Sequence, residues 1–254
     1  MNVLFIDSGI GGISTLCTCV QHMPNLNFIY YADNKYAPYG NLSTEQITSR
    51  ICSIINSQLK HNIGLVVIAC NTATACSIDT IRGLYKIPIV GTEPAIKPAC
   101  NNKDNNVIVF ATPATAVNPR ILRLTNNSPC NIDIVALPKL ARLIDSYFLY
   151  GDIASHQQIE QELKNISKLS ANKTHIVLGC THYIFLKEEI LKATKCTVLD
   201  GNVGVCKQLK RLVSNKFSSP RPTQKFVFSL QNSDLCKNYR KIFEQTLAKR
   251  INVW

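Results

Sequence analysis

Nine short apolar segments recur along this chain, and their pattern is the feature that most restricts its fold. Each segment is a continuous run of apolar side chains, which is typical of strands in a parallel sheet that is covered on both faces. The runs are Val3–Ile6, Phe28–Tyr31, Leu65–Ala69, Ile87–Val90, Val107–Phe110, Ile132–Leu137, His175–Leu178, Thr197–Leu199 and Lys225–Leu230. They predict nine strands of parallel sheet.

Amphipathic segments lie between these runs. Helical spacing is followed by Ile47, Ile51, Ile54, Ile55 and Leu59, and again by Leu235, Tyr239, Ile242, Phe243 and Leu247. The alternation of strands with helices predicts a doubly wound α/β architecture.

A weak internal repeat indicates two related halves. Asn2–Ser8 resembles Asn106–Thr112, Val66–Thr72 resembles Ile176–His182, and Ile89–Gly91 loosely matches Val198–Asp200. The offsets of 104, 110 and 109 residues are nearly constant, as duplicated α/β units would give. The alternative is that all buried strands look alike. Pro94 and Pro98 mark a first crossover between the halves, and Gly201 to Gly204 mark a second.

Polar or reactive residues directly follow four of the runs. They are Asp7-Ser8, Cys70-Asn71-Thr72, Thr112 and Cys180-Thr181-His182. Because ligands bind at the carboxyl ends of parallel strands, we expect these side chains to face one crevice. The small residues Ala69 and Gly179 precede the two cysteines and permit close backbone packing. A single cysteine is readily explained as a buried apolar side chain, but two at matching strand ends favour a chemical role.

Two thiols that face one crevice suggest a reaction with two proton carriers. In the racemisation of an amino acid, one group removes the proton from Cα and the other delivers a proton to the opposite face. The thiolate is the active base, so each cysteine needs a neighbour that helps it to ionise or to hold its proton. Asp7 and His182 are the candidates. The alternatives are a helix cap for Asp7 and a purely hydrogen-bonded role for His182.

Two loops add candidate binding groups. The glycine-rich turn Ser8–Gly12 lacks the motifs of nucleotide-binding loops, so a carboxylate at a helix N-terminus is the better interpretation. The turn-rich segment Asp33–Gly40 follows the second run and would reach the same crevice. No lysine lies in a recognisable pyridoxal site.

Cysteine usage and charge argue against several other classes of protein. The 11 cysteines include no Cys-x-x-Cys pair, so we expect no zinc site, no disulfide framework and mostly reduced thiols. The net charge of +12 comes from dispersed basic residues without a nucleic-acid-binding motif, so a basic nucleic-acid-binding protein is kept only as an alternative. Without a membrane-spanning run or a signal peptide, we expect a cytoplasmic protein.

Taken together, the motifs resemble the glutamate racemase family of the wider aspartate/glutamate racemase superfamily. They are Ile6–Gly12, Pro38–Gly40, Ala69–Ala73, Glu93–Pro98 and Leu178–Tyr183. The resemblance runs from Asp7 to about Asp200. Aspartate racemases typically carry histidine where Thr74 stands and glutamate where His182 stands, which favours glutamate as the substrate.

The resemblance implies two α/β domains with the active site between them and with neither a cofactor nor a metal. The first domain would comprise residues 1–96 and 208–254, and the second residues 97–207. Cys70 would serve the D-isomer and Cys180 the L-isomer, assisted by Asp7 and His182. The substrate-binding residues would be Ser8, Pro38, Tyr39, Gly40, Asn71, Thr72, Thr112, Thr115 and Thr181. The family role is to supply D-glutamate for bacterial peptidoglycan.

Some positions depart from the family pattern. Ile184 replaces a common proline, Arg142 and Asp145 replace proline and glutamate, and Gly201-Asn202 replaces a serine-containing turn. The shorter side chain of Asp145 puts a substrate role for that residue in doubt. A racemase of aspartate or another acidic amino acid is the alternative, because one methylene changes binding by only about 1–3 kcal/mol. We expect a small-molecule substrate and neither a membrane nor a nucleic-acid partner, and we leave a homodimer open.

Overall fold

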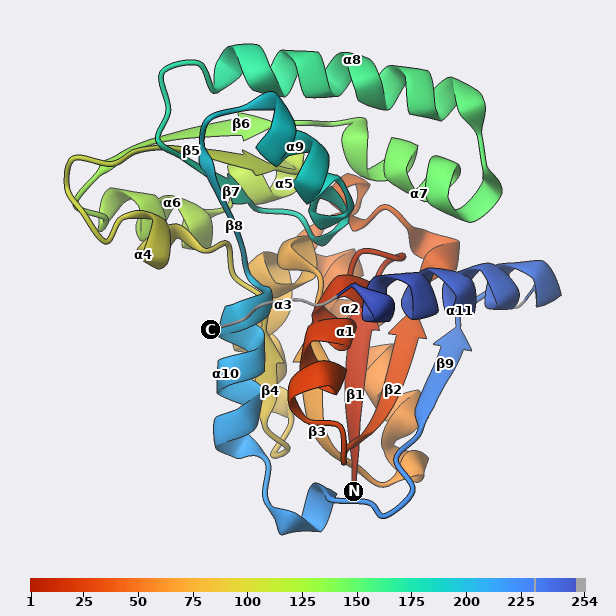
Figure 1. Cartoon of the computed structure of the whole chain (residues 1–254). Coiled ribbons are helices and arrows are strands. Elements are labelled where there is room, and N and C mark those ends of the chain that lie inside the picture. The colour runs from red at the N-terminus through yellow and green to blue at the C-terminus, as the bar shows by residue number, and fades with distance from the viewer. Residues whose placement is uncertain (231, 250–254) are drawn as a thin grey trace. The chain divides into compact units, whose positions relative to one another are not determined.

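The computed structural model describes residues 1–230 and 232–249, which form two parallel sheets with helices (Figure 1). The chain divides into unit 1, Met1–Thr92 with Asn202–Trp254, and unit 2, Glu93–Gly201. These divisions come four and six residues before the boundaries that we predicted at 96/97 and 207/208. Residues 231 and 250–254 of the predicted first domain lie outside the described residues.

Unit 1 carries a five-stranded sheet in the order β4-β3-β1-β2-β9, and every pair of neighbouring strands is parallel. Its strands are β1 (Asn2–Asp7), β2 (Asn27–Ala32), β3 (Ile63–Ile68), β4 (Ile89–Gly91) and β9 (Gln224–Phe228). Its helices are α1 (Ile13–His22), α2 (Thr44–Gln58), α3 (Asn71–Leu84), α10 (Asn202–Leu212) and α11 (Ser233–Ala248). Its 3-10 turns are η1 (Asn34–Tyr36), η2 (Tyr39–Asn41), η3 (Leu59–His61) and η5 (Asn215–Phe217).

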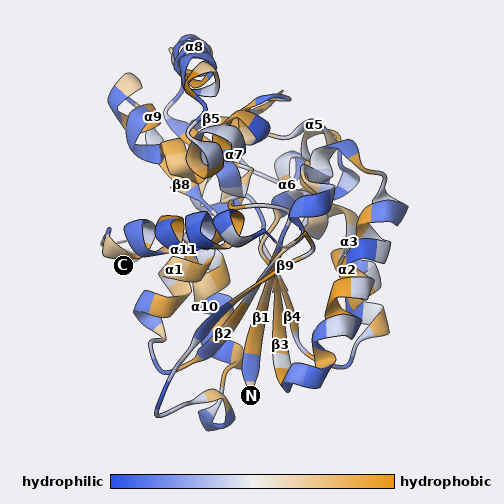
Figure 2. Ribbon diagram, turned by 90° about the vertical axis from the view of Figure 1, so that its right-hand side faces the viewer, coloured by the Kyte–Doolittle hydropathy of each residue, from blue (hydrophilic) through white to orange (hydrophobic). Residues whose placement is uncertain are grey.

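The helices of unit 1 cover both faces of its sheet. Helix α1 packs with α10 and α11, whereas α2 packs with α3 on the opposite face (Figure 2). The predicted apolar stripe of α2 is buried through Ile47, Ile51, Ile54 and Ile55. A capping box starts this helix, because Ser43 accepts a hydrogen bond from the backbone of Gln46 and the Gln46 side chain accepts one in return. The doubly wound arrangement that the sequence predicts is therefore present in unit 1.

Unit 2 carries a four-stranded parallel sheet in the order β6-β5-β7-β8. Its strands are β5 (Asn106–Ala111), β6 (Asn131–Ala136), β7 (His175–Leu178) and β8 (Thr197–Asp200). Its helices and its 3-10 turn are α4 (Ile96–Ala99), α5 (Pro113–Ala116), α6 (Pro119–Asn126), α7 (Leu140–Tyr150), α8 (Ile153–Leu169), η4 (Thr181–Leu186) and α9 (Lys187–Ala193). All nine predicted runs are strands in the structure, with ends that differ by at most two residues.

The two sheets share one strand order and one register, which strengthens the internal repeat seen in the sequence. Strands β4-β3-β1-β2 of unit 1 correspond to β8-β7-β5-β6 of unit 2. Phe5 pairs with Val67 in unit 1, and the residues at the offsets of the repeat, Val109 and Val177, pair in unit 2. The loosely matched third segment follows the same rule, because Val67 pairs with Val90 as Val177 pairs with Leu199. The repeat thus reflects equivalent positions in two sheets.

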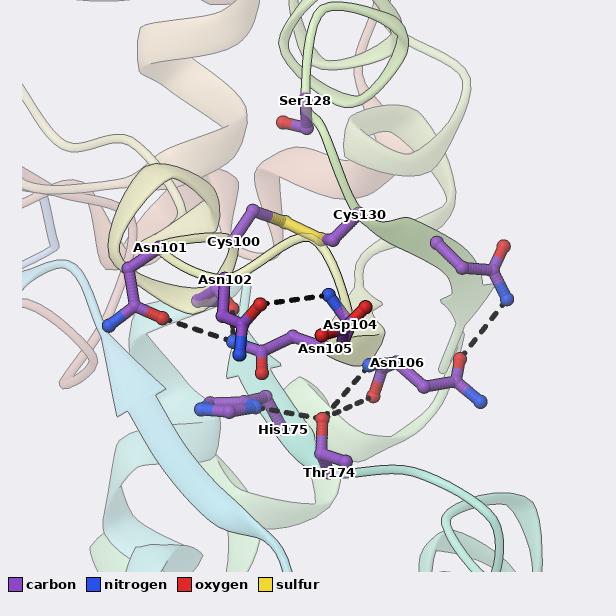
Figure 3. Close-up of a disulfide and its surroundings, with 12 residues drawn as sticks. Cys100, Asn101, Asn102, Asp104, Asn105, Asn106, Ser128, Cys130, Thr174 and His175 are labelled. Carbon is purple, nitrogen blue, oxygen red and sulfur yellow. Dashed lines mark hydrogen bonds between the residues drawn. A yellow bond between two sulfur atoms is a disulfide. The ribbon is translucent and has the colours of Figure 1, made fainter.

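Nine of the 11 cysteines are free thiols, in agreement with the expectation of mostly reduced thiols, but one pair is oxidised. Cys100 and Cys130 form a disulfide in unit 2, between the residue after α4 and the residue before β6 (Figure 3). The intervening turn is compact: Asn105 donates hydrogen bonds to the carbonyl of Ala99 and to the side chain of Asn101. This turn leads directly into β5, which pairs with β6, and the Cα atoms of the two cysteines come within 5.4 Å. A separation of 30 residues gives no sign of that proximity in the sequence.

The lengths and hydropathies of the helices bear on whether the chain could cross a membrane. Within residues 1–230 and 232–249, none combines the length and hydropathy that crossing a bilayer requires.

Candidate active site

In unit 1, two of the predicted site segments lie at the ends of neighbouring strands. The chain passes from β1 to β2 on one side and then crosses to β3 on the other, so the order of strands reverses between β1 and β3. Asp7 and Ser8 lie at the carboxyl end of β1, and Cys70 follows β3; all three are buried. Ligands in open α/β sheets bind at such a reversal. The fold therefore brings Asp7, Ser8 and Cys70 to the expected place within unit 1.

The glycine-rich turn after β1 is tightly held. Asp7 Oδ1 accepts a hydrogen bond from the backbone N–H of Gly9 at 2.9 Å, and the Tyr30 hydroxyl donates to the carbonyl of Gly9 at 2.7 Å. A Cβ atom on Gly12 would lie 2.9 Å from the Cβ atoms of both Asp7 and Ala69, so this position has no room for a side chain. Asp7 therefore holds the turn, and the alternative of a helix cap is wrong, because helix α1 begins after Gly12 without a side-chain cap.

Cys70 is the N-cap residue of helix α3. Its Sγ accepts a hydrogen bond from the backbone N–H of Ala73 at 3.5 Å. The N-terminus of a helix stabilises negative charge, and a thiolate placed there gains from that field. The next two residues, Asn71 and Thr72, are buried, and the Oδ1 atom of Asn71 has no hydrogen-bond partner among the described residues. A buried oxygen of this kind is suited to accept a hydrogen bond from a ligand.

Tyr39 is held by Asp33, which the sequence placed only as the first residue of a turn-rich segment, and by Arg50, which it did not single out. Its hydroxyl donates a hydrogen bond to Asp33 Oδ2 at 2.6 Å, and Asp33 is fully buried at the end of β2. Arg50, on α2, forms a bidentate ion pair with the same carboxylate. Asp33 could have been found by the rule that selected Asp7, because both carboxylates lie at the carboxyl end of a strand. Arg50 lies in the middle of a helix, where the sequence gives no such signal.

In unit 2, the order of strands reverses between β5 and β7, and the equivalent segments lie there. Thr112 follows β5 and is the N-cap of α5, where its hydroxyl donates to that of Thr115 at 2.9 Å. Cys180 follows Gly179, whose backbone N–H donates to the carbonyl of Phe110 at 2.8 Å. A Cβ atom on Gly179 would lie 3.0 Å from that carbonyl oxygen, which confirms the close backbone approach predicted there.

Cys180, His182 and Asp145 form a chain of contacts in unit 2. The Sγ atom of Cys180 lies 3.8 Å from Nδ1 of His182, and Nε2 of His182 lies 3.2 Å from Oδ1 of Asp145. Burial by itself lowers the pKa of His182, but the charge of Asp145 and the contacts with Asp145 and Cys180 outweigh it and raise the pKa well above its usual value. The imidazole therefore favours its charged form, in which both ring nitrogens are donors.

Asp145 contacts His182, a role that the sequence did not predict for it. The shorter side chain of Asp145 put a substrate role in doubt, and the structure shows that this carboxylate contacts the histidine instead. Thr181 lies between the cysteine and the histidine and is also buried. The departure from the family pattern could not reveal this contact, because it joins residues 37 positions apart.

A pocket of about 540 Å³ lies elsewhere in unit 2, beside α4 and α6, and none of the predicted site residues lines it. Lys97, Arg120 and Arg123 line it, and Arg120 is paired with Glu93. In the part of the chain that the structure describes, no three His, Cys, Asp or Glu side chains gather as metal ligands would.

Comparisons with known proteins agree on one family. A model described as Asp/Glu/Hydantoin racemase matches residues 19–209. A glutamate racemase of Clostridium botulinum (strain Alaska E43 / Type E3) is 39% identical over 218 residues, which are 84% of this chain and 83% of that protein.

Solved structures show the same fold. The glutamate racemase of Escherichia coli, in complex with L-glutamate and the activator UDP-MurNAc-Ala, has a TM-score of 0.84 at 24% identity, covering 96% of this chain and 95% of that chain. The glutamate racemase of Francisella tularensis subsp. tularensis SCHU S4, in complex with D-glutamate, has a TM-score of 0.77 at 26% identity, covering 98% and 94%.

Proposed function

This chain belongs to the Asp/Glu/Hydantoin racemase family, and we propose that it interconverts L-glutamate and D-glutamate by proton transfer at Cα between Cys70 and Cys180. The identity of 39% to a glutamate racemase supports the choice of substrate. The observation that carries the chemistry is the placement of the cysteines. Each follows the equivalent strand of its own sheet, where the order of the strands reverses.

The L-isomer is assigned to Cys180. In the L-to-D direction, the Cys180 thiolate takes the proton from Cα of L-glutamate, and the thiol of Cys70 gives its proton to the opposite face. Cys180 ends as the thiol and Cys70 as the thiolate, so the number of protons is conserved. Charged His182, supported by Asp145, stabilises the Cys180 thiolate before the transfer. In the D-to-L direction the two cysteines exchange roles.

Asp7 is the group assigned to assist Cys70. It lies at the end of β1, the strand that pairs with β3 before Cys70, and the N-terminus of α3 adds a favourable field for the thiolate. Substrate carboxylates and the ammonium group are assigned to Ser8, Pro38, Tyr39, Gly40, Asn71, Thr72, Thr112, Thr115 and Thr181. The unpartnered buried oxygen of Asn71 supports a contact with the ammonium group.

The proposal includes a biological role. D-glutamate made by this enzyme would be supplied for peptidoglycan, in the cytoplasm, without pyridoxal phosphate, metal or nucleotide.

Circular dichroism of each glutamate enantiomer tests the activity directly. After exhaustive dialysis with a chelator, the purified protein should bring L- and D-glutamate to the same end point at zero ellipticity. No decay, or decay only after pyridoxal phosphate is added, would contradict the proposal. A panel with aspartate and other acidic amino acids tests the substrate, and faster turnover of aspartate would favour the alternative racemase.

A further inference from the structure

Asp33 is fully buried and lies at the centre of a polar cluster in unit 1, whose Arg50 is partly exposed. Both of its carboxylate oxygens are used: Oδ1 accepts from Arg50 Nη2 at 2.8 Å, and Oδ2 accepts from Arg50 Nε at 2.9 Å and from the Tyr39 hydroxyl at 2.6 Å. Two parallel bonds from a guanidinium fix direction as well as distance. The guanidinium also stacks over the ring of Tyr36, with its carbon 4.0 Å from the ring centre.

The cluster adjoins Cys70. Tyr39 is 1% exposed and belongs to the same buried apolar group as Cys70 and Ala73, which lies in the first turn of α3. Burial first, and then the carboxylate of Asp33 and the charge of a Cys70 thiolate, raise the pKa of Tyr39 far above its usual value. The hydroxyl therefore keeps its proton and remains a donor to Asp33.

We propose that Asp33 and Arg50 are positioning residues that anchor the Tyr39 hydroxyl and thereby hold the Pro38–Gly40 segment beside Cys70. The inference deepens the proposed function and rests on it for its kinetic consequences. It distinguishes two roles within the Tyr39 assignment: the hydroxyl makes an internal hydrogen bond to Asp33, and the Pro38–Gly40 segment that this bond anchors binds the substrate.

Arg50 is needed because Asp33 is fully buried. Without the guanidinium, the carboxylate would be an unpaired charge in an apolar surrounding, which is strongly unfavourable. The carboxylate would take up a proton or move towards water, and either change removes or redirects the acceptor of the Tyr39 hydroxyl. The segment would then lose its fixed position beside Cys70.

Four variants test the proposal: Tyr39→Phe, Arg50→Met, Arg50→Lys and the control Arg82→Met. Arg82 also lies on a helix of unit 1 and donates to the carbonyl of Ile89, outside the cluster. Tyr39→Phe and Arg50→Met should raise KM for both enantiomers by about tenfold, the loss expected for one hydrogen bond to a charged group, with a smaller change in kcat. Arg50→Lys keeps the positive charge but loses the bidentate geometry of the guanidinium, so its KM should lie between that of the wild type and that of Arg50→Met. Arg82→Met should keep the wild-type KM.

A second measurement does not depend on racemisation. In a Cys180→Ser background, the rate at which iodoacetamide modifies Cys70 is followed by mass spectrometry, at a pH high enough to ionise the thiol in every variant. Because Cys70 is only 7% exposed, displacing the segment should speed its modification in Tyr39→Phe and more so in Arg50→Met. Arg82→Met should leave the rate unchanged.

The outcomes separate this inference from the proposed function. Wild-type KM and a wild-type modification rate in Tyr39→Phe and Arg50→Lys would overturn it, even if Arg50→Met failed to fold. Loss of kcat at unchanged KM in Tyr39→Phe would place the hydroxyl in the chemistry and also overturn it. If Arg82→Met changed KM and the Cys70 modification rate as much as Arg50→Met does, the effect would be general destabilisation, and the proposal would be overturned. If the wild type does not racemise glutamate, the proposed function fails and the modification rates alone decide the positioning role.

Discussion

Nε2 of His182 lies 3.2 Å from Oδ1 of Asp145, so a buried histidine has a carboxylate behind it while its other ring nitrogen faces Cys180. The arrangement suits an imidazolium, which can donate to a thiolate on one side and to a carboxylate on the other. It also links the charge of the histidine to a residue outside the sequence motif, and this link can be tested by substitution.

Asp145→Asn should lower the pKa of His182, because burial then acts without the opposing carboxylate. At neutral pH the imidazole would lose its proton and stabilise the Cys180 thiolate less. Racemisation should fall, and the basic limb of its pH profile should move to lower pH. An NMR titration of the histidine ring measures the pKa itself, and an unchanged His182 titration would contradict this account.

The same pair predicts a pH-dependent stability difference. A folded-state pKa above the unfolded value contributes stability that is fully present below about pH 6.5 and is lost as the pH rises through the folded pKa. The deficit of Asp145→Asn in free energy of unfolding should therefore be largest near pH 6 and should shrink at higher pH. Urea unfolding across this range measures the difference, and His156→Gln, at a half-exposed histidine, is the control for loss of a less buried imidazole.

Cys70→Ala and Cys180→Ala should each abolish racemisation, because one face of Cα then lacks its proton carrier. The wild-type enzyme in D2O should place solvent deuterium at Cα of the product enantiomer, since the incoming proton comes from an exchangeable thiol. Proton NMR of early product measures the incorporation. Substantial retention of the original Cα hydrogen, or near-normal activity of either variant, would rule out the two-thiol assignment.

Gly12→Ala should destabilise the protein by about 1–3 kcal/mol, as expected for overpacking. The new methyl group would meet Asp7 and Ala69 at 2.9 Å and the Tyr30 hydroxyl at 3.0 Å. Gly83→Ala is the matched control, because it lies in helix α3 with no atom within 4 Å of the new Cβ, and it should stabilise by about 0.5–1 kcal/mol. Denaturant unfolding compares the two, and equal effects would contradict the tight packing of the turn.

Because Cys100 and Cys130 form a disulfide, nine of the 11 cysteines should react with a thiol reagent in denaturant before reduction. All 11 should react after reduction. Opening it should cost about 3–4 kcal/mol if it acts by restricting a loop of this length in the unfolded chain. In an oxidising buffer, Cys130→Ser should have a lower Tm than the wild type. In a reducing buffer, in which the wild type also lacks the disulfide, the two Tm values should be close. Eleven thiols before reduction would contradict the pairing.

Much of the fold follows from local sequence pattern. The strands are continuous apolar runs because both faces of the sheets are covered, and the stripe on α2 sits at helical spacing. The candidate residues Asp7, Cys70 and Cys180 follow from a general property of parallel sheets, which gather strand ends at one edge. The weak repeat was enough to indicate related halves, although the shared register became visible only when the strands were paired.

Only the tertiary structure decided the partners of those residues. Asp145 with His182, Arg50 with Asp33, and Cys100 with Cys130 join positions that are 37, 17 and 30 residues apart. Periodicity reports which side of a helix or strand is buried, because that depends on neighbours within a few residues. It does not report which distant side chain completes a buried polar group, because that depends on how the elements pack. The sequence therefore determined at which strand ends the reactive residues lie, and tertiary packing determined which charged and hydrogen-bonding side chains contact them.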